Sequence, residues 1–178
     1  QRNNDFSGWI EIEGTKIDYP VMHNTQSNAY YLHRNFNRED SNARIPFLDF
    51  QCMINPRSDN IIIYSHNMKN GEMFHDLLNY KDINYYKEHN KVKYDTLYET
   101  GEYEIFAVIR TKVGSSNEFK YYNYINFNDE AGFNSFVNTA IERSLYNTGV
   151  IPVFGDKLLT LSTCSYNTDN ERFVVFCK

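Results

Sequence analysis

The feature that most constrains the fold is a set of short segments in which apolar and polar residues alternate around turn residues. Residues 9–22, "WIEIEGTKIDYPVM", alternate on both sides of Glu13-Gly14, and residues 91–112 alternate on both sides of Thr100-Gly101. Alternation with a period of two is typical of strands that bury one face, and a central glycine is typical of a hairpin turn. The sequence therefore predicts two hairpins, one near the start of the chain and one in its middle.

Other segments predict further strands and a smaller helical content. The additional strand candidates are residues 43–50, 60–64, 157–163 and 172–178, and the short helix candidates are residues 27–36, 72–80 and 82–89. The best helix is predicted between Phe127 and Gly149, with Asn128 or Asp129 as cap and Gly149 as stop. Many short strands with few helices indicate a mostly β barrel or sandwich with helical insertions.

Length and charge limit the functional classes. The 178 residues, 41% of them hydrophobic, suffice for one core, so residues 1–178 are expected to form a single domain. The net charge of -5 and the scattered basic residues argue against binding to nucleic acid or to an anionic membrane surface. No apolar run reaches the roughly 20 residues of a membrane span, and the chain starts at Gln1. Any signal or anchor segment is therefore expected outside this chain.

The cysteines do not form a disulfide framework or a zinc motif. Cys52, Cys164 and Cys177 are too few and too irregularly spaced for either. If the last two strands pair so that Cys164 lies opposite Arg172, Cys164 and Cys177 are roughly 17 Å apart, too far for a disulfide. Cys177 is interpreted as a small buried hydrophobe, and Cys52 as either the same or a partly exposed bystander. No carboxylate or Cys/His cluster has a calcium or zinc pattern, so no metal or cofactor is expected.

The same pairing gives Cys164 a chemical context. It places Thr160, Ser162, Cys164 and Arg172 on one face, where a guanidinium favours a thiolate and supplies donors to an oxyanion. A cysteine nucleophile also needs a proton carrier, normally histidine. The chain has five histidines: His23, His33, His66, His75 and His89. His66 follows the apolar strand 60–64 in a polar loop, the usual place for a working residue, whereas the other four suit a solvated surface better.

"TLSTC", followed eight positions later by Arg172 and preceded by "NIIIYSHNM", resembles the sortases, specifically class B. "KIDYPVM", "YYL", "IPFLDF", "GEMF" and "RFVVF" occur in the family's order and cover nearly the whole chain. The resemblance implies a closed β-barrel of about eight strands with short N-terminal helices and an inserted helix at about 128–148.

The resemblance also implies a reaction. Cys164 would cut a cell-wall sorting signal of the N-P-x-T-N or x-P-x-T-G type after its Thr and form a thioacyl enzyme. His66 would protonate the departing amine and deprotonate the incoming one, while Arg172 would steady the substrate and the oxyanion. A peptidoglycan amine would then take over the surface protein, at the extracytoplasmic face of a membrane to which a segment outside this chain anchors the enzyme.

Substrate contacts follow from the resemblance by position alone. Ser162, Asn28, Leu32 and Tyr122 are assigned to the substrate groove. Acidic residues often follow the nucleophile in class B sortases, whereas Ser165 and Tyr166 do so here, which changes the expected substrate contacts.

Three other interpretations fit parts of the sequence. A papain-like peptidase shares the Cys-His chemistry, but its cysteine comes early, at the start of a helix, with the histidine downstream. A non-enzymatic extracellular adhesin fits the mostly β pattern and the richness in Tyr and Asn. A plain cysteine peptidase would use the same residues without an acceptor amine. Rapid labelling of Cys164 by a thiol-directed probe would separate the enzymatic interpretations from the adhesin.

Overall fold

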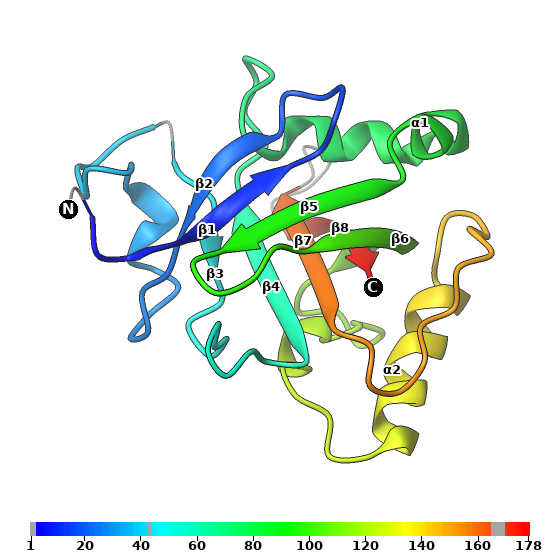
Figure 1. The fold of residues 1–178 in the computed structure, drawn as a ribbon. Coiled ribbons are helices and arrows are strands. Elements are labelled where there is room, and N and C mark those ends of the chain that lie inside the picture. Colours follow the sequence, from blue (N-terminus) through cyan, green and yellow to red (C-terminus); the bar gives the residue numbers. More distant parts are fainter. Residues whose placement is uncertain (1–2, 43, 165–169) are drawn as a thin grey trace.

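The computed structural model describes residues 3–42, 44–164 and 170–178, and within them eight strands close into a barrel (Figure 1). The strands are β1 (Phe6–Glu11), β2 (Asp18–Met22), β3 (Phe47–Leu48), β4 (Asn60–Ser65), β5 (Lys91–Thr96), β6 (Glu102–Lys112), β7 (Leu158–Cys164) and β8 (Glu171–Cys177). Their order around the barrel is β1-β2-β3-β4-β7-β8-β6-β5. The predicted closed, mostly β barrel is confirmed.

Both predicted hairpins are present. β1 pairs antiparallel with β2, and β5 pairs antiparallel with β6. The first turn contains Gly14 at a φ of 77°, a left-handed conformation that glycine adopts without steric cost. The predicted strand 43–50 is much shorter than expected, because only Phe47 and Leu48 form ladder bonds.

The helical segments are shorter than the sequence predicts. They are α1 (Ile83–Glu88), α2 (Glu130–Glu142) and the 3-10 helices η1 (Tyr31–His33), η2 (Phe74–Lys81) and η3 (Tyr121–Asn123). The Asp129 side chain caps α2 by accepting from the Gly132 amide at 2.8 Å. α2 ends before Gly149 because the chain turns to β6, where the Leu145 amide donates to the Val108 carbonyl at 2.8 Å.

The centre of the barrel is built by neighbouring strands that are buried on both faces. β4 and β7 pair in parallel, with Ile63 opposite Leu161 and Ser65 opposite Thr163. Ile61, Ile62, Ile63, Leu159 and Leu161 are all fully buried. Such continuous apolar runs are typical of parallel strands covered on both sides. The pairing brings the carboxyl ends of β4 and β7 to the same end of the barrel.

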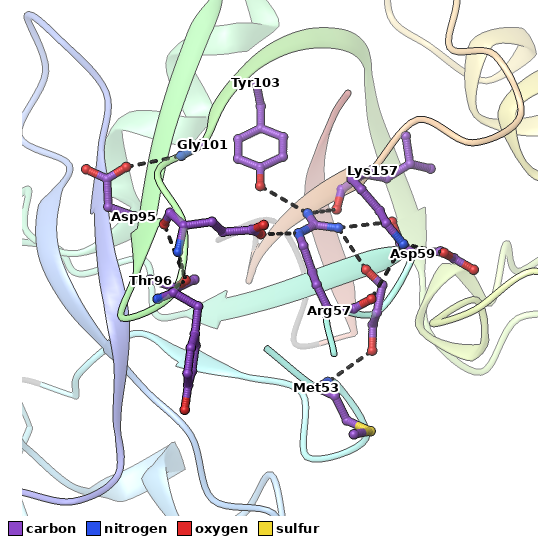
Figure 2. Close-up of polar contacts among 12 residues, drawn as sticks. Met53, Arg57, Asp59, Asp95, Thr96, Gly101, Tyr103 and Lys157 are labelled. Atoms are coloured by element: carbon purple, nitrogen blue, oxygen red, sulfur yellow. Dashed lines mark hydrogen bonds and ion pairs between the residues drawn. The ribbon is translucent and has the colours of Figure 1, made fainter. Parts of the chain in front are cut away.

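At the opposite end, Arg57 joins the starts of these strands to the β5–β6 hairpin (Figure 2). Its side chain is 7% exposed and lies 3.1 Å from a carboxylate oxygen of Glu99. The guanidinium donates to the carbonyl of Leu158 at 2.9 Å and to the hydroxyl of Tyr103 at 3.1 Å. A second ion pair, between Lys157 and Asp59 at 2.7 Å, lies beside it. These contacts hold together the end of the barrel at which β4 and β7 begin.

Candidate active site

Topology brings the predicted catalytic positions together. Ser65 and Thr163 are parallel partners, so His66 and Cys164 are the next residues along two neighbouring strands. On the other side of β7, Cys164 pairs with Arg172 of β8 in an antiparallel ladder. The register inferred from the sequence is thus the observed one, and the three positions meet at one end of the barrel.

A groove of about 280 Å³ lies at this end. Its lining residues are Asn28, Ala29, Leu32, Phe47, Tyr64, Ser65, His66, Ser162, Thr163 and Arg172. The lining therefore includes five of the site residues predicted from the sequence: His66, Arg172, Ser162, Asn28 and Leu32. Tyr122 is not among the described residues that line it, and its hydroxyl donates to the Glu118 carboxylate at 2.8 Å.

The neighbouring Tyr121 contacts Ser162, one of the residues that line the groove. The hydroxyl of Tyr121 lies 2.7 Å from that of Ser162, and both side chains are buried. Tyr121 and Tyr122 both belong to the single turn η3, so the sequence alone does not show which ring turns toward β7.

One wall of the groove is anchored by a buried carboxylate that sequence reasoning missed. Asp49 is 2% exposed and accepts from the Asn28 amide at 2.9 Å and from the Tyr64 hydroxyl at 3.0 Å. The Asn28 side chain also accepts from the Phe50 amide at 2.8 Å, so it is held on both sides. Burial, reinforced by the Asp49 charge, raises the pKa of Tyr64, which keeps this phenol a neutral donor. Asn28 is thus a fixed part of the wall.

η1 supplies another part of the groove lining. Tyr31 is fully buried and packs in one cluster with Met22, Ile45 and Phe47. Its hydroxyl donates to the Asp5 carboxylate at 2.6 Å. This anchor presents Leu32, which is 38% exposed, to the groove.

The His66 ring is held by two groups. Its Nε2 lies 3.2 Å from the carbonyl oxygen of Leu32, and Nη1 of Arg44 lies 3.2 Å from each ring nitrogen. Burial, followed by the Arg44 charge, lowers the pKa of His66 to about 4. The ring is therefore a neutral imidazole at pH 7. Sequence reasoning missed Arg44, which precedes His66 by 22 residues and carries no motif.

Arg172 reaches the groove from β8. Its side chain lines the groove, and Nη1 donates to the carbonyl of Glu171 at 3.1 Å. A guanidinium is always protonated, so it supplies fixed donors at this end of the barrel.

The other two cysteines are both buried, as small hydrophobes of the core would be. Cys52 is 1% exposed, and burial raises the pKa of its thiol to about 12. Cys177 is fully buried, and the same effect raises the pKa of its thiol. Cys177 pairs with Leu159, five residues along β7 from Cys164, which agrees with the expectation that these two cysteines do not bond.

The described ranges contain neither a cluster of metal ligands nor a helix that could span a membrane. Across residues 3–42, 44–164 and 170–178, no group of three or more His, Cys, Asp or Glu could hold a metal ion. In the same part of the chain, no helix has the length and apolar character required to cross a membrane.

Known proteins match both the sequence and the fold. The family described as the sortase domain matches residues 10–178. Sortase B of Listeria monocytogenes is 35% identical over 170 residues, covering 96% of this chain and 67% of the relative. Sortase B of Staphylococcus aureus is 29% identical over 180 residues, covering 99% of this chain and 70% of the relative.

Solved structures agree with these sequence matches. A Staphylococcus aureus sortase B–substrate complex has a TM-score of 0.90 at 28% identity, covering 99% of this chain and 80% of the other. Sortase B from Bacillus anthracis in complex with AAEK1 has a TM-score of 0.87 at 34% identity, covering all of this chain and 80% of the other. The chain therefore belongs to the sortase family, in class B, and is a cysteine transpeptidase of cell-wall sorting.

Proposed function

We propose that Cys164, His66 and Arg172 transfer a surface protein from its sorting signal to a peptidoglycan amine. The observation that carries this proposal is the strand register, because the parallel β4–β7 pair and the antiparallel β7–β8 pair bring the three positions to one groove. A nucleophile, a proton carrier and fixed donors are what acyl transfer requires.

The chemistry proceeds in two steps. The Cys164 thiol gives its proton to His66 as its sulfur attacks the carbonyl carbon of the signal's Thr, and the developing oxyanion accepts hydrogen bonds from Arg172. The C–N bond breaks, the amine leaves with that proton from His66, and a thioester to Cys164 remains. An acceptor amine then attacks the thioester, and His66 takes the amine's proton and passes it to the departing Cys164 sulfur, so the thiol is regenerated as the new amide forms.

The groove supports a short peptide as the substrate. Leu32, Phe47 and Tyr64 give it apolar surface, and Ser162 adds a hydroxyl near its β7 side. The Staphylococcus aureus sortase B of similar fold was solved as a substrate complex, which supports a substrate site in this fold. A signal of the N-P-x-T-N or x-P-x-T-G type fits such a groove, because Pro bends the peptide and Thr carries the acyl carbon to the thiol. The assignment of Tyr122 as a substrate contact stays a prediction.

The setting of the reaction follows from its substrates. Surface proteins with a C-terminal sorting signal and a stem-peptide or cross-bridge amine meet outside the cytoplasm, so the enzyme works at the extracytoplasmic face of the membrane. An anchor segment outside this chain would hold it there.

The test offers N-P-x-T-N, x-P-x-T-G and L-P-x-T-G peptides with and without a diamino acid or oligoglycine and identifies the products by mass. The first two should be cut after Thr and joined to the acceptor amine. Fastest cleavage of the Leu-containing peptide would refute the class B specificity. Hydrolysis that no amine diverts would leave a plain cysteine peptidase.

Single substitutions test the catalytic roles proposed for Cys164 and His66. Cys164→Ala and His66→Ala should each abolish cleavage while circular dichroism shows an intact fold. Cys52→Ala removes a thiol that lies outside the lining of the groove and should retain cleavage. A folded Cys164→Ala variant with near-normal turnover would overturn the assignment, and a thioester adduct mapped to Cys164 would support it.

A further inference from the structure

Arg44 meets His66 because of the pairing between β3 and β4. Phe47 lies opposite Tyr64 in this antiparallel pair, so the chain just before β3 runs beside the chain just after β4. Arg44 is three residues before Phe47, and His66 is two residues after Tyr64. The contact between them is therefore built into the barrel register and lies at the edge of the groove.

The geometry of this contact selects one state of the ring. Nη1 of Arg44 is 3.2 Å from Nδ1 and 3.2 Å from Nε2 of His66. A guanidinium has only donors, and an imidazolium also has only donors, so at this distance the two cations repel each other. A neutral imidazole offers one lone pair instead. The contact thus favours the uncharged ring.

The Leu32 carbonyl decides which nitrogen carries the hydrogen. It lies 3.2 Å from Nε2 and is an acceptor only, so Nε2 donates to it. Nδ1, which lies as close to Nη1 of Arg44 as Nε2 does, is then the acceptor of the neutral ring. The Leu32 carbonyl thus selects the tautomer, and the Arg44 charge selects the neutral form.

The other charged and titratable groups around the ring either oppose a positive charge on it, as Arg44 does, or take part in the proposed reaction. His33 of η1 and Arg172 of β8 both oppose a positive charge on His66, as does burial, and the Arg44 charge is the largest of the charge effects. Cys164, at the end of β7, is the nucleophile proposed above.

We propose that Arg44 is a positioning residue that holds the His66 ring uncharged, with its hydrogen on Nε2, in the free enzyme. This inference rests on the proposed function of His66 as the proton carrier. An imidazolium that forms beside Arg44 during the reaction is a strong acid and gives its proton readily to the leaving amine. The neutral ring that remains is ready to accept a proton from the acceptor amine.

The test is an NMR titration of the His66 ring without substrate. Every protein carries Cys164→Ala, so that the ring does not titrate together with the thiol. The variants compared are Arg44→Met, which removes the charge, and Arg44→Lys, which keeps it. Lys69→Met is the matched control, because Lys69 is exposed in the same loop as His66 and also loses one positive charge.

The pKa of His66 should be low in the parent, rise by about one pH unit or more in Arg44→Met, and stay low in Arg44→Lys. Lys69→Met should leave it nearly unchanged. Long-range 1H–15N spectra of the parent at pH 7 should show the hydrogen on Nε2. Arg44→Gln provides a second uncharged variant if Arg44→Met does not fold.

A His66 pKa that is the same in Arg44→Met as in the parent would overturn the inference, as would an equal rise in Lys69→Met or a hydrogen on Nδ1. The titration needs no substrate, so it is independent of the peptide experiments. Absence of peptide cleavage by the unmodified enzyme would refute the proposed function, whereas an unchanged titration would refute only the role of Arg44.

Discussion

Cys164 and Arg172 are directly opposed in the antiparallel ladder between β7 and β8. The pair is the last one before the loop that joins the two strands, at the end of the barrel where the groove lies. Backbone hydrogen bonds thereby hold Arg172 next to the position of the proposed nucleophile, and its side chain lines the groove. Its placement therefore depends on the pairing of the two strands.

Arg172→Lys tests whether this placement requires the planar guanidinium. Lysine keeps the positive charge but loses the rigid set of donors, so turnover of a sorting peptide should fall roughly 100-fold. Arg110→Lys is a matched control, because Arg110 is exposed on β6 and pairs with Phe173 of β8, and it should keep normal turnover. A lysine variant at position 172 with near-normal kcat would show that charge alone is sufficient.

Arg57→Met should weaken the fold without touching the groove. The variant leaves the Leu158 carbonyl and the Tyr103 hydroxyl without the guanidinium, at a site where the side chain is 7% exposed. We expect the free energy of unfolding, measured in urea, to fall by about 3 kcal/mol. Turnover per folded molecule should be unchanged, because this end of the barrel is remote from Cys164.

Glu99→Gln is the control for this prediction. Glu99 is 45% exposed, so losing its ion pair with Arg57 should cost at most about 1 kcal/mol. An equal loss in both variants would mean that the ion pair, rather than the buried hydrogen bonds, holds this end of the barrel together.

The fold was predictable wherever local pattern determines it. Alternation around Gly14 and Gly101 predicted both hairpins, and the short loop between the last two strands predicted the pairing of Cys164 with Arg172. The parallel contact between β4 and β7 joins segments about 100 residues apart, and no local pattern in one sequence indicates it. The same reason explains the helix that ends early, since the Leu145 amide bonds to distant Val108.

The site was predictable only in part, for a similar physical reason. His66 has a local signal, a polar residue after a buried strand, and the groove contains it. Arg44 and Asp49 act through contacts with residues distant in sequence, so nothing near them indicates a role. Tyr121 and Tyr122 are identical neighbours in the one turn of η3, and only the structure shows that the first contacts Ser162 and the second contacts Glu118.

Chelation should leave peptide cleavage unchanged. The proposed reaction uses a thiol, an imidazole and a guanidinium, and the described residues include no group suited to hold a metal. The measurement is turnover before and after dialysis against EDTA. A loss of activity that one divalent cation restores would show that a metal takes part.

Acid should destabilise the folded protein through His66. The unfolded chain takes up a proton on His66 near the ordinary pKa of 6.5, whereas the folded protein does so only near its lowered pKa of about 4. Between these values the unfolded state binds more protons, so the free energy of unfolding falls as the pH drops from 6.5 to 4 and is unaffected above 6.5.

His66→Gln measures this contribution. Because the ring is partly exposed and screened by solvent, its share of the loss should be about 1 to 2 kcal/mol. Urea unfolding of the wild type and of His66→Gln at pH 7 and pH 4.5 isolates it, since the variant should lose less stability on acidification. Burial also lowers the pKa of His23, so part of the loss of stability in acid remains in both proteins. Equal losses in both proteins would mean that the folded protein protonates His66 as easily as the unfolded chain does, and that the ring is not held neutral in the groove.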